Sequence, residues 1–114
     1  MKQIRIMRKK PGEAPEFITI DNTLEALQAE VGGYIEPVTV AENLVIICDE
    51  EGRLKEKPHN CRLFGSLDLV GTILFVGRRG EHFADVPMNE RTAKRLFPSL
   101  WSGISEKTGG GDPA

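Results

Sequence analysis

The chain has 114 residues, of which 39% are hydrophobic and 28% charged, and its formal net charge is -2. This length is typical of one domain and allows one core without disulfides or metals. The near-neutral charge excludes a general attraction to nucleic acid or anionic membranes, and no apolar run is long enough to span a bilayer.

The cysteines and the N-terminus indicate where the protein resides. Cys48 and Cys61 are too few for a disulfide framework. The charged N-terminus is not followed by the apolar stretch of a secretory signal. We therefore expect a cytoplasmic protein.

The first twenty residues predict two antiparallel strands. Ile4 and Ile6 alternate with polar neighbours, as in a half-buried strand. Pro11 and Gly12 interrupt the chain, and a β-branched stretch then runs from Phe17 to Asp21. The basic residues of the first segment are typical of an edge strand protected against aggregation.

A helix is predicted after Asp21. Asn22 as N-cap would place Glu25 at the third helical position, in a variant of the capping box. Gly32 and Gly33 would end the helix, because glycine adopts the left-handed cap conformation without strain. Four residues share one face of this helix at helical spacing: Leu24, Leu27, Gln28 and Val31.

Two strands should follow this helix. Tyr34 to Val40 is β-branched and contains Pro37, so we expect an edge strand or a bulge there. Leu44 to Cys48 is continuously apolar and predicts a buried central strand. Residues 49–52 should form a solvated acidic turn with a positive φ angle at Gly52.

The second half of the chain is less regular. Residues 53–67 predict a long irregular segment, which in compact domains is often functional. Residues 69–76 predict a second buried strand, residues 77–80 a tight turn and residues 81–84 a brief returning strand. A second helix should run over residues 89–97, with Asn89 as its cap.

These elements predict an α+β fold with a small, mostly antiparallel sheet of five to six strands and two helices, in the order ββαββ-loop-β(β)α. We expect one domain over residues 1–101 and a disordered tail over residues 102–114, because the tail holds little apolar area. Edge strands of such sheets can pair across a two-fold axis, so a homodimer is one expectation.

Cationic residues in two predicted turns form the first candidate site. If the two turns share one end of the sheet, they make a rim for a nucleotide-like anion. Aromatic residues are not interleaved with them, so a nucleic-acid partner is not expected. This candidate consists of Lys9, Lys10, Arg78 and Arg79, with Asn60 and Arg62 from the irregular segment.

Tyr34 and Glu36 form a second candidate, a partner surface beside the glycine pair. Because the two residues are two positions apart in a strand, their side chains would face the same side of the sheet. A simple helix cap followed by strand entry explains the same residues.

The remaining polar residues predict no metal, cofactor or catalytic set. Cys48, His59, Cys61 and His82 lack the paired spacing of a zinc site. From Asp49, the twelfth position of a calcium loop would be an asparagine instead of glutamate. A thiol enzyme using Cys61 stays an alternative, although no spacing favours it.

Three segments together resemble a known family: residues 22–36 (NTLEALQAEVGGYIE), 49–60 (DEEGRLKEKPHN) and 71–81 (GTILFVGRRGE). They are similar to a bacterial and bacteriophage family catalogued as domain of unknown function 3846. The resemblance covers roughly residues 1–97 and implies a phage, prophage or plasmid setting, with no established activity and no catalytic residues to carry over.

We therefore expect a non-catalytic accessory protein of a mobile element that contacts a host protein. One alternative is a protein that binds or sequesters a small nucleotide-like anion. The other is a thiol-dependent enzyme that uses residues 59–62.

Overall fold

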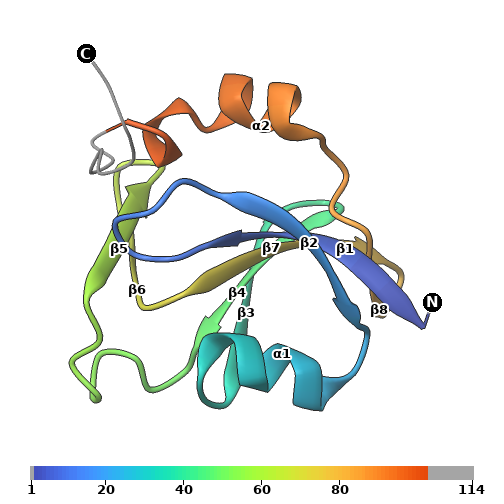
Figure 1. Cartoon of the computed structure of the whole chain (residues 1–114), viewed down its shortest axis with the longest axis horizontal. Helices are drawn as coiled ribbons and strands as arrows, with labels where there is room; N and C mark the ends of the chain where they lie inside the picture. The colour runs from blue at the N-terminus through green and yellow to red at the C-terminus, as the bar shows by residue number, and fades with distance from the viewer. Residues whose placement is uncertain (1, 103–114) are drawn as a thin grey trace.

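The computed structural model describes residues 2–102, and in this part of the chain it has eight strands, two α-helices and a short 3-10 helix (Figure 1). In chain order they are β1 (Gln3–Lys9), β2 (Glu16–Asp21), α1 (Leu24–Val31), β3 (Ile35–Ala41), β4 (Leu44–Asp49), β5 (His59–Leu63), β6 (Leu67–Val70), β7 (Ile73–Arg79), β8 (His82–Ala84), α2 (Glu90–Leu96) and η1 (Pro98–Leu100). The expected tail is residues 102–114, and all of it except Ser102 lies outside the described residues.

All strand pairs are antiparallel. The main sheet has the order β2-β1-β7-β4-β3, and β8 pairs with the end of β7, while β5 and β6 form a separate hairpin. The fold is therefore α+β with an antiparallel sheet, as predicted. No helix within residues 2–102 has the length and apolar character needed to cross a membrane.

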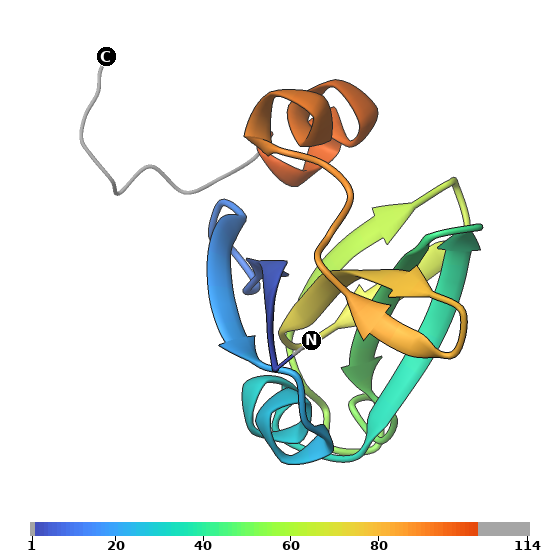
Figure 2. The same cartoon turned by 90° about the vertical axis from the view of Figure 1, so that its right-hand side faces the viewer.

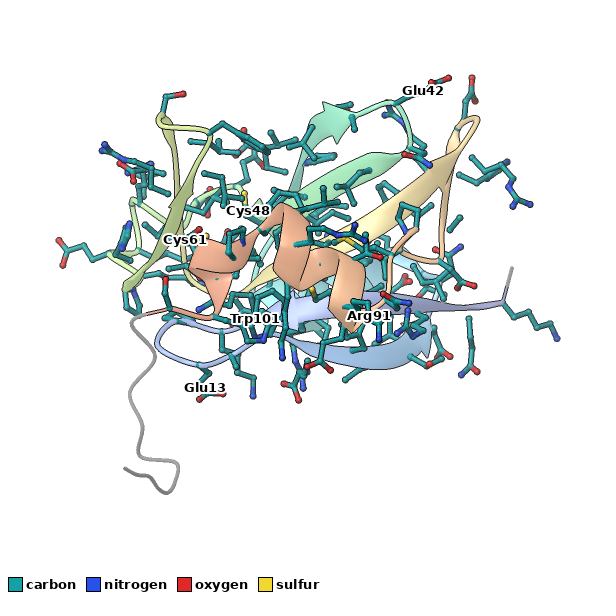
Figure 3. The ribbon with its side chains drawn as sticks, turned by 90° about the horizontal axis from the view of Figure 1, so that it is seen from above. Glu13, Glu42, Cys48, Cys61, Arg91 and Trp101 are labelled. Atoms are coloured by element: carbon teal, nitrogen blue, oxygen red, sulfur yellow. The ribbon has the colours of Figure 1, made fainter. Side chains whose placement is uncertain are left out.

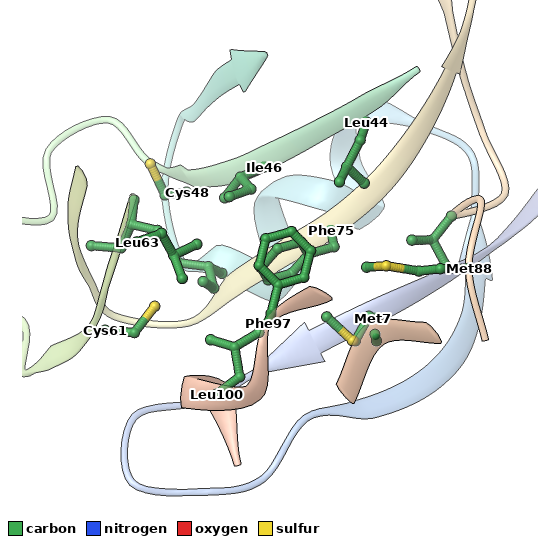
Figure 4. Close-up of a cluster of buried hydrophobic side chains, with 14 residues drawn as sticks. Met7, Leu44, Ile46, Cys48, Cys61, Leu63, Phe75, Met88, Phe97 and Leu100 are labelled. Carbon is green, nitrogen blue, oxygen red and sulfur yellow. The ribbon is translucent and has the colours of Figure 1, made fainter. Parts of the chain in front are cut away.

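The two faces of the main sheet are covered by different elements. Helix α1 covers one face with Leu27 and Val31, and α2 with η1 lies on the opposite side (Figures 1 and 2). On the α2 side, Phe75 and Phe97 pack at the centre of the larger core, with ring centroids 5.4 Å apart and the rings tilted by 55° (Figure 4). The hairpin β5–β6 adds Cys61, Leu63 and other side chains to this core.

Helix α1 ends as predicted but begins one residue later. Gly32 has φ +79° and caps the helix. At the other end, the Thr23 hydroxyl accepts a hydrogen bond from Ala26 N–H, so Thr23 is the N-cap instead of Asn22. The Asn22 side chain is used elsewhere: its amide donates to the Phe83 carbonyl and ties the helix entry to β8.

The strand β3 lies at the open edge of the sheet, as its proline predicted. Its register with β4 pairs Pro37 with Ile47, and a bulge follows between Thr39 and Ala41. The Tyr34 carbonyl accepts the backbone N–H of Glu50, so Tyr34 is at a hydrogen-bonded position. Hydrogen-bonded and non-hydrogen-bonded residues alternate from there along the ladder. Even-numbered residues of β3 therefore bond to β4, and the backbone groups of odd-numbered residues point away from it.

This alternation explains why proline is tolerated. Pro37 occupies an outward position, so its missing N–H removes no bond to β4. Ile35 and Thr39, on either side of it, present their N–H groups along the open edge. The fully buried neighbour β4 confirms the predicted central strand.

The predictions of an irregular segment over residues 53–67 and of one strand over residues 69–76 are partly wrong. Much of residues 53–67 belongs to the hairpin β5–β6, and residues 69–76 are divided between β6 and β7. Gly71 causes the division, because its φ of +72° turns the chain out of the strand. Strand β5 has only two alternating apolar residues, Cys61 and Leu63, which is too short a period to be recognised from the sequence.

The β7–β8 turn is shifted relative to the prediction, whereas α2 is confirmed. Strand β7 continues through Arg79, and Gly80, with φ +63°, forms the turn. The Asn89 side chain caps α2 by accepting the N–H of Thr92. Gly52 does not have the positive φ angle expected of it; within residues 2–102 this conformation occurs at five other glycines.

Candidate functional site

Asp49, at the end of β4, is buried between two lysines, and these three residues are named here the Asp49 cluster. The Asp49 side chain is 1% exposed and lies 2.7 Å from Lys57 Nζ and 2.9 Å from Lys55 Nζ. Lys57 Nζ also donates to the Val31 carbonyl at 2.7 Å, and Lys55 Nζ donates to the Gly32 carbonyl at 3.1 Å. The lysines thus satisfy both a buried carboxylate and the free carbonyls at the end of α1.

The electrostatics of the cluster hold Asp49 ionised. Burial by itself raises the pKa of this carboxyl, but hydrogen bonds from Lys57, Lys55 and the Glu51 N–H outweigh burial and lower the pKa to about 2. The predicted solvated turn is therefore wrong for Asp49, although Glu50 and Glu51 are exposed.

Glycines surround the Asp49 cluster because side chains would not fit. A Cβ at Gly33 would lie 2.6 Å from Asp49 Oδ1 and from Lys55 Nζ, and one at Gly71 would lie 2.9 Å from Lys57 Cδ. Gly32 thus caps the helix, and Gly33 leaves the space that the Asp49 carboxylate and the Lys55 amine occupy. The three segments that carry the family resemblance meet at this cluster.

The Asp49 cluster has a positioning role. It anchors residues 50–57 against α1, and these residues form one wall of a groove. The cluster itself offers little to a ligand, since its carboxylate is enclosed and both lysines are already bonded.

The groove lies between the open edge strand β3 and the hairpin strand β6, with a cavity volume of about 270 Å³. We call it the β3 groove. Glu36 and Val38 line it from β3, Glu50 and Leu54 from the adjoining turn, and residues 67–70 from the hairpin. It therefore borders the open edge strand β3 along Glu36 and Val38.

Carboxylates dominate the charge of the β3 groove. Asp68 is compensated by Arg62, which donates two hydrogen bonds to it, and His59 Nε2 lies 3.5 Å from its carboxylate. Neither Glu36 nor Glu50 forms an ion pair with any residue in the described range 2–102. The guanidinium of Arg53 donates to the Asp68 carbonyl at 2.7 Å.

Both thiols are side chains of the buried core. Burial raises the pKa of Cys48 to about 11 and also raises that of Cys61, so both thiols stay protonated at neutral pH. The two sulfur atoms lie on opposite sides of Leu63 (Figure 4). Among residues 2–102 no three His, Cys, Asp or Glu side chains gather as metal ligands.

The candidate cationic residues are not brought together. Lys9 pairs with Ile73 at the start of β7, whereas Arg79 is six positions further along this strand, which is about 20 Å at 3.3 Å per residue. Lys9 is also only 3% exposed, and burial lowers the pKa of its amine. The shared rim envisaged for these residues, with Lys10 and Arg78, is not formed.

Asn60 and Arg62 serve the hairpin. Asn60 Nδ2 donates to the carbonyls of Lys9 and Gly71, at 2.8 and 2.7 Å, and thereby links β5 to β1. Arg62 pairs with Asp68 across the hairpin. Of the predicted residues, Glu36 lines the β3 groove, and Tyr34 lies just before β3 with a side chain that is 65% exposed.

Sequence reasoning missed the Asp49 cluster and the β3 groove. The signal for the cluster was present: an acid that directly follows a buried strand, with two lysines shortly after it and a glycine pair before it. The groove had no local signal, because it depends on how the hairpin packs beside β3.

Comparisons with known proteins identify the family of the chain. The family model described as a domain of unknown function matches residues 4–97, which include all strands and α2 apart from the first residue of β1. No curated protein and no solved structure matches the chain. The protein therefore belongs to the family named domain of unknown function 3846.

Proposed function

We propose that the protein is a non-catalytic accessory protein of a phage or another mobile element, and that it binds a host protein in the cytoplasm. The contact surface is the open edge of β3 together with the β3 groove. A segment of the partner adds to β3 as a further antiparallel or parallel strand, a common mode of peptide recognition.

The observation that carries this proposal is the open edge itself. Ile35 and Thr39 present outward N–H groups, and Ile35, Pro37 and Thr39 present outward carbonyls. An unpaired row of this kind is a template for another strand. The missing N–H of Pro37 and the bulge after Thr39 limit unspecific pairing without closing the edge.

Exposed apolar side chains beside the edge support the same surface. Tyr34 is 65% exposed just before β3, and Leu54 is 84% exposed on the rim of the β3 groove. Val38 is half-buried on the groove side of β3. Apolar side chains around a polar groove are typical of protein contact sites.

The mobile-element setting comes from the family resemblance, and the host partner follows from it as an expectation. The absence of an activated thiol among residues 2–102 favours binding over thiol catalysis. The separation of Lys9 from Arg79 removes the geometric basis of the nucleotide-like anion site.

A matched pair of photo-crosslinking variants tests the proposal. Thr39 on β3 and Thr19 on β2 are both exposed threonines on open edges, and in both the backbone N–H points outward. A benzophenone amino acid replaces each in the full chain, expressed in the bacterial host.

We expect irradiation to link the Thr39 variant to one host protein and to leave the Thr19 variant unlinked. The Thr19 variant controls for random collisions at an open strand. Equal labelling from both positions, or none from Thr39, would contradict the proposal.

A further inference from the structure

We infer that the β3 groove receives a basic side chain, arginine or lysine, from the partner segment that adds to β3. This inference rests on the proposed function and specifies the chemistry of the partner. It follows from the register of the open edge, the charges around the groove and the apolar character of its floor.

The register of the edge directs a partner side chain into the groove. A strand added to β3 bonds to the outward groups of Ile35 and Thr39, so Glu36 and Val38 become non-hydrogen-bonded positions of the new ladder. When the added strand is antiparallel, such positions have the closest approach, with about 4.5 Å between Cα atoms, and their side chains share one face. The partner residue opposite Glu36 or Val38 therefore projects over the β3 groove.

The charges available to this side chain are mostly negative. Glu36 and Glu50 are exposed carboxylates of the groove and have no ion-pair partner among residues 2–102. Asp49 and Asp68 already have cationic partners, whereas Arg53 keeps its positive charge, since its guanidinium donates to the neutral Asp68 carbonyl. Glu36 and Glu50 outnumber this one cation, so the groove attracts a basic side chain and disfavours an acidic one.

The floor of the groove suits the stem of a long basic side chain. Val38 and Leu69 supply apolar surface, and the Cys48 side chain lines the same cavity with its thiol directed to the Glu36 carbonyl at 3.7 Å. Lysine and arginine bury their methylene groups on such surfaces while the charged head stays at the rim. The β3 groove thus matches both parts of a basic side chain.

Selection from a random peptide library displayed on phage tests this inference, with the full chain as bait. Three baits are compared: the wild type, the double variant Glu36→Lys/Glu50→Lys, and the control Glu42→Lys. Glu42 is exposed in the β3–β4 turn, at the opposite end of this hairpin from Cys48 (Figure 3). The control thus has the same kind of charge reversal away from the groove.

We expect peptides selected on the wild type to share one basic position, and peptides selected on the double variant to carry an acidic residue there. The Glu42→Lys bait should keep the basic position. Replacing that basic residue by alanine in a selected peptide should weaken binding to the wild type by about tenfold or more, which corresponds to about 1.4 kcal/mol.

The outcomes separate the two proposals. Peptides that protect the outward amides of β3 from hydrogen exchange but share no basic position would overturn the inference and leave strand addition standing. A library without binders to the wild-type bait would contradict both. If the double variant is unfolded by circular dichroism, Glu36→Gln and Glu50→Gln replace it, and unchanged affinity for a basic peptide in both would overturn the inference.

Discussion

Asp49 shows how one buried charge can organise a loop. Removing a carboxylate from water is costly, and the cost is offset here by two ammonium groups and the Glu51 N–H. The lysines in turn need the carboxylate, since Lys57 is partly buried against the end of α1. Loss of the negative charge would leave two cations facing each other.

The pH dependence of Asp49→Asn is the first prediction. The carboxyl has a pKa of about 2 in the folded chain, against an ordinary value of 3.8. A lowered pKa stabilises the fold above the ordinary value, by about 2 kcal/mol at 1.36 kcal/mol per pKa unit. In urea unfolding at neutral pH, the free energy of unfolding of Asp49→Asn should therefore be lower than that of the wild type by about this amount.

This difference in the free energy of unfolding should shrink as the pH falls from 3.8 towards 2, because the unfolded chain's carboxyl then takes up a proton while the folded one stays ionised until about 2. Glu50→Gln is the matched control, since Glu50 is the exposed neighbour and should change stability by less than about 0.5 kcal/mol. If the difference in the free energy of unfolding between wild type and Asp49→Asn did not change over this pH range, the low pKa assigned to Asp49 would be contradicted.

Gly33→Ala is the second prediction. A Cβ at this position would lie 2.6 Å from Asp49 Oδ1 and 2.8 Å from Asp49 Cγ, and two lysines hold this carboxylate in place. We expect a loss of about 2 kcal/mol in the free energy of unfolding, as for other overpacking substitutions.

Gly80→Ala is the control for Gly33→Ala. A Cβ at Gly80 meets nothing within 4 Å, but its φ is +63°, so only the left-handed backbone strain of about 1 kcal/mol applies. A smaller loss for Gly33→Ala than for Gly80→Ala, measured by urea unfolding, would show that the cluster tolerates the extra atom.

At the scale of elements, β3 combines an open edge with devices that restrain it. Pro37 interrupts the outward row of donors, and the bulge between Thr39 and Ala41 ends the regular ladder. A strand without such devices would pair with copies of itself. The edge is therefore accessible to a suitable partner segment and protected against unspecific pairing.

Pro37→Thr is the third prediction. Threonine restores an outward N–H at the centre of the edge, so the variant should self-associate at lower concentrations than the wild type. Static light scattering over a concentration series measures this. Pro11→Thr, in the β1–β2 turn, should behave as the wild type, and equal masses for all three chains would argue against an accessible β3 edge.

The elements that the sequence predicted well have strong local signals. The continuous apolar run marked β4, the proline marked β3 as an edge strand, and Gly32 marked the end of α1. The hairpin β5–β6 was missed because it is short and one face carries polar residues. Thr23 and Asn22 are both good caps, and only the contact of Asn22 with β8 decides between them.

At the scale of the whole molecule, packing brings together what the sequence separates. Lys57 reaches the end of α1 across 26 residues, and Asn60 reaches β1 across 51 residues. The cationic rim failed for a related reason: the register of β1 and β7 places Lys9 and Arg79 far apart. Local patterns contain no information on such registers, so Glu36 could be predicted as a surface residue but the groove beside it could not.

The central claim is that a partner strand adds to the open edge of β3. Hydrogen exchange measured by NMR on the full chain, with and without a peptide selected on it, tests this claim most directly. We predict that the amides of Ile35 and Thr39 exchange more slowly in the complex, while the amide of Thr19 on the β2 edge keeps its rate. Unchanged exchange at Ile35 and Thr39 in a saturated complex, or protection on β2 instead, would contradict it.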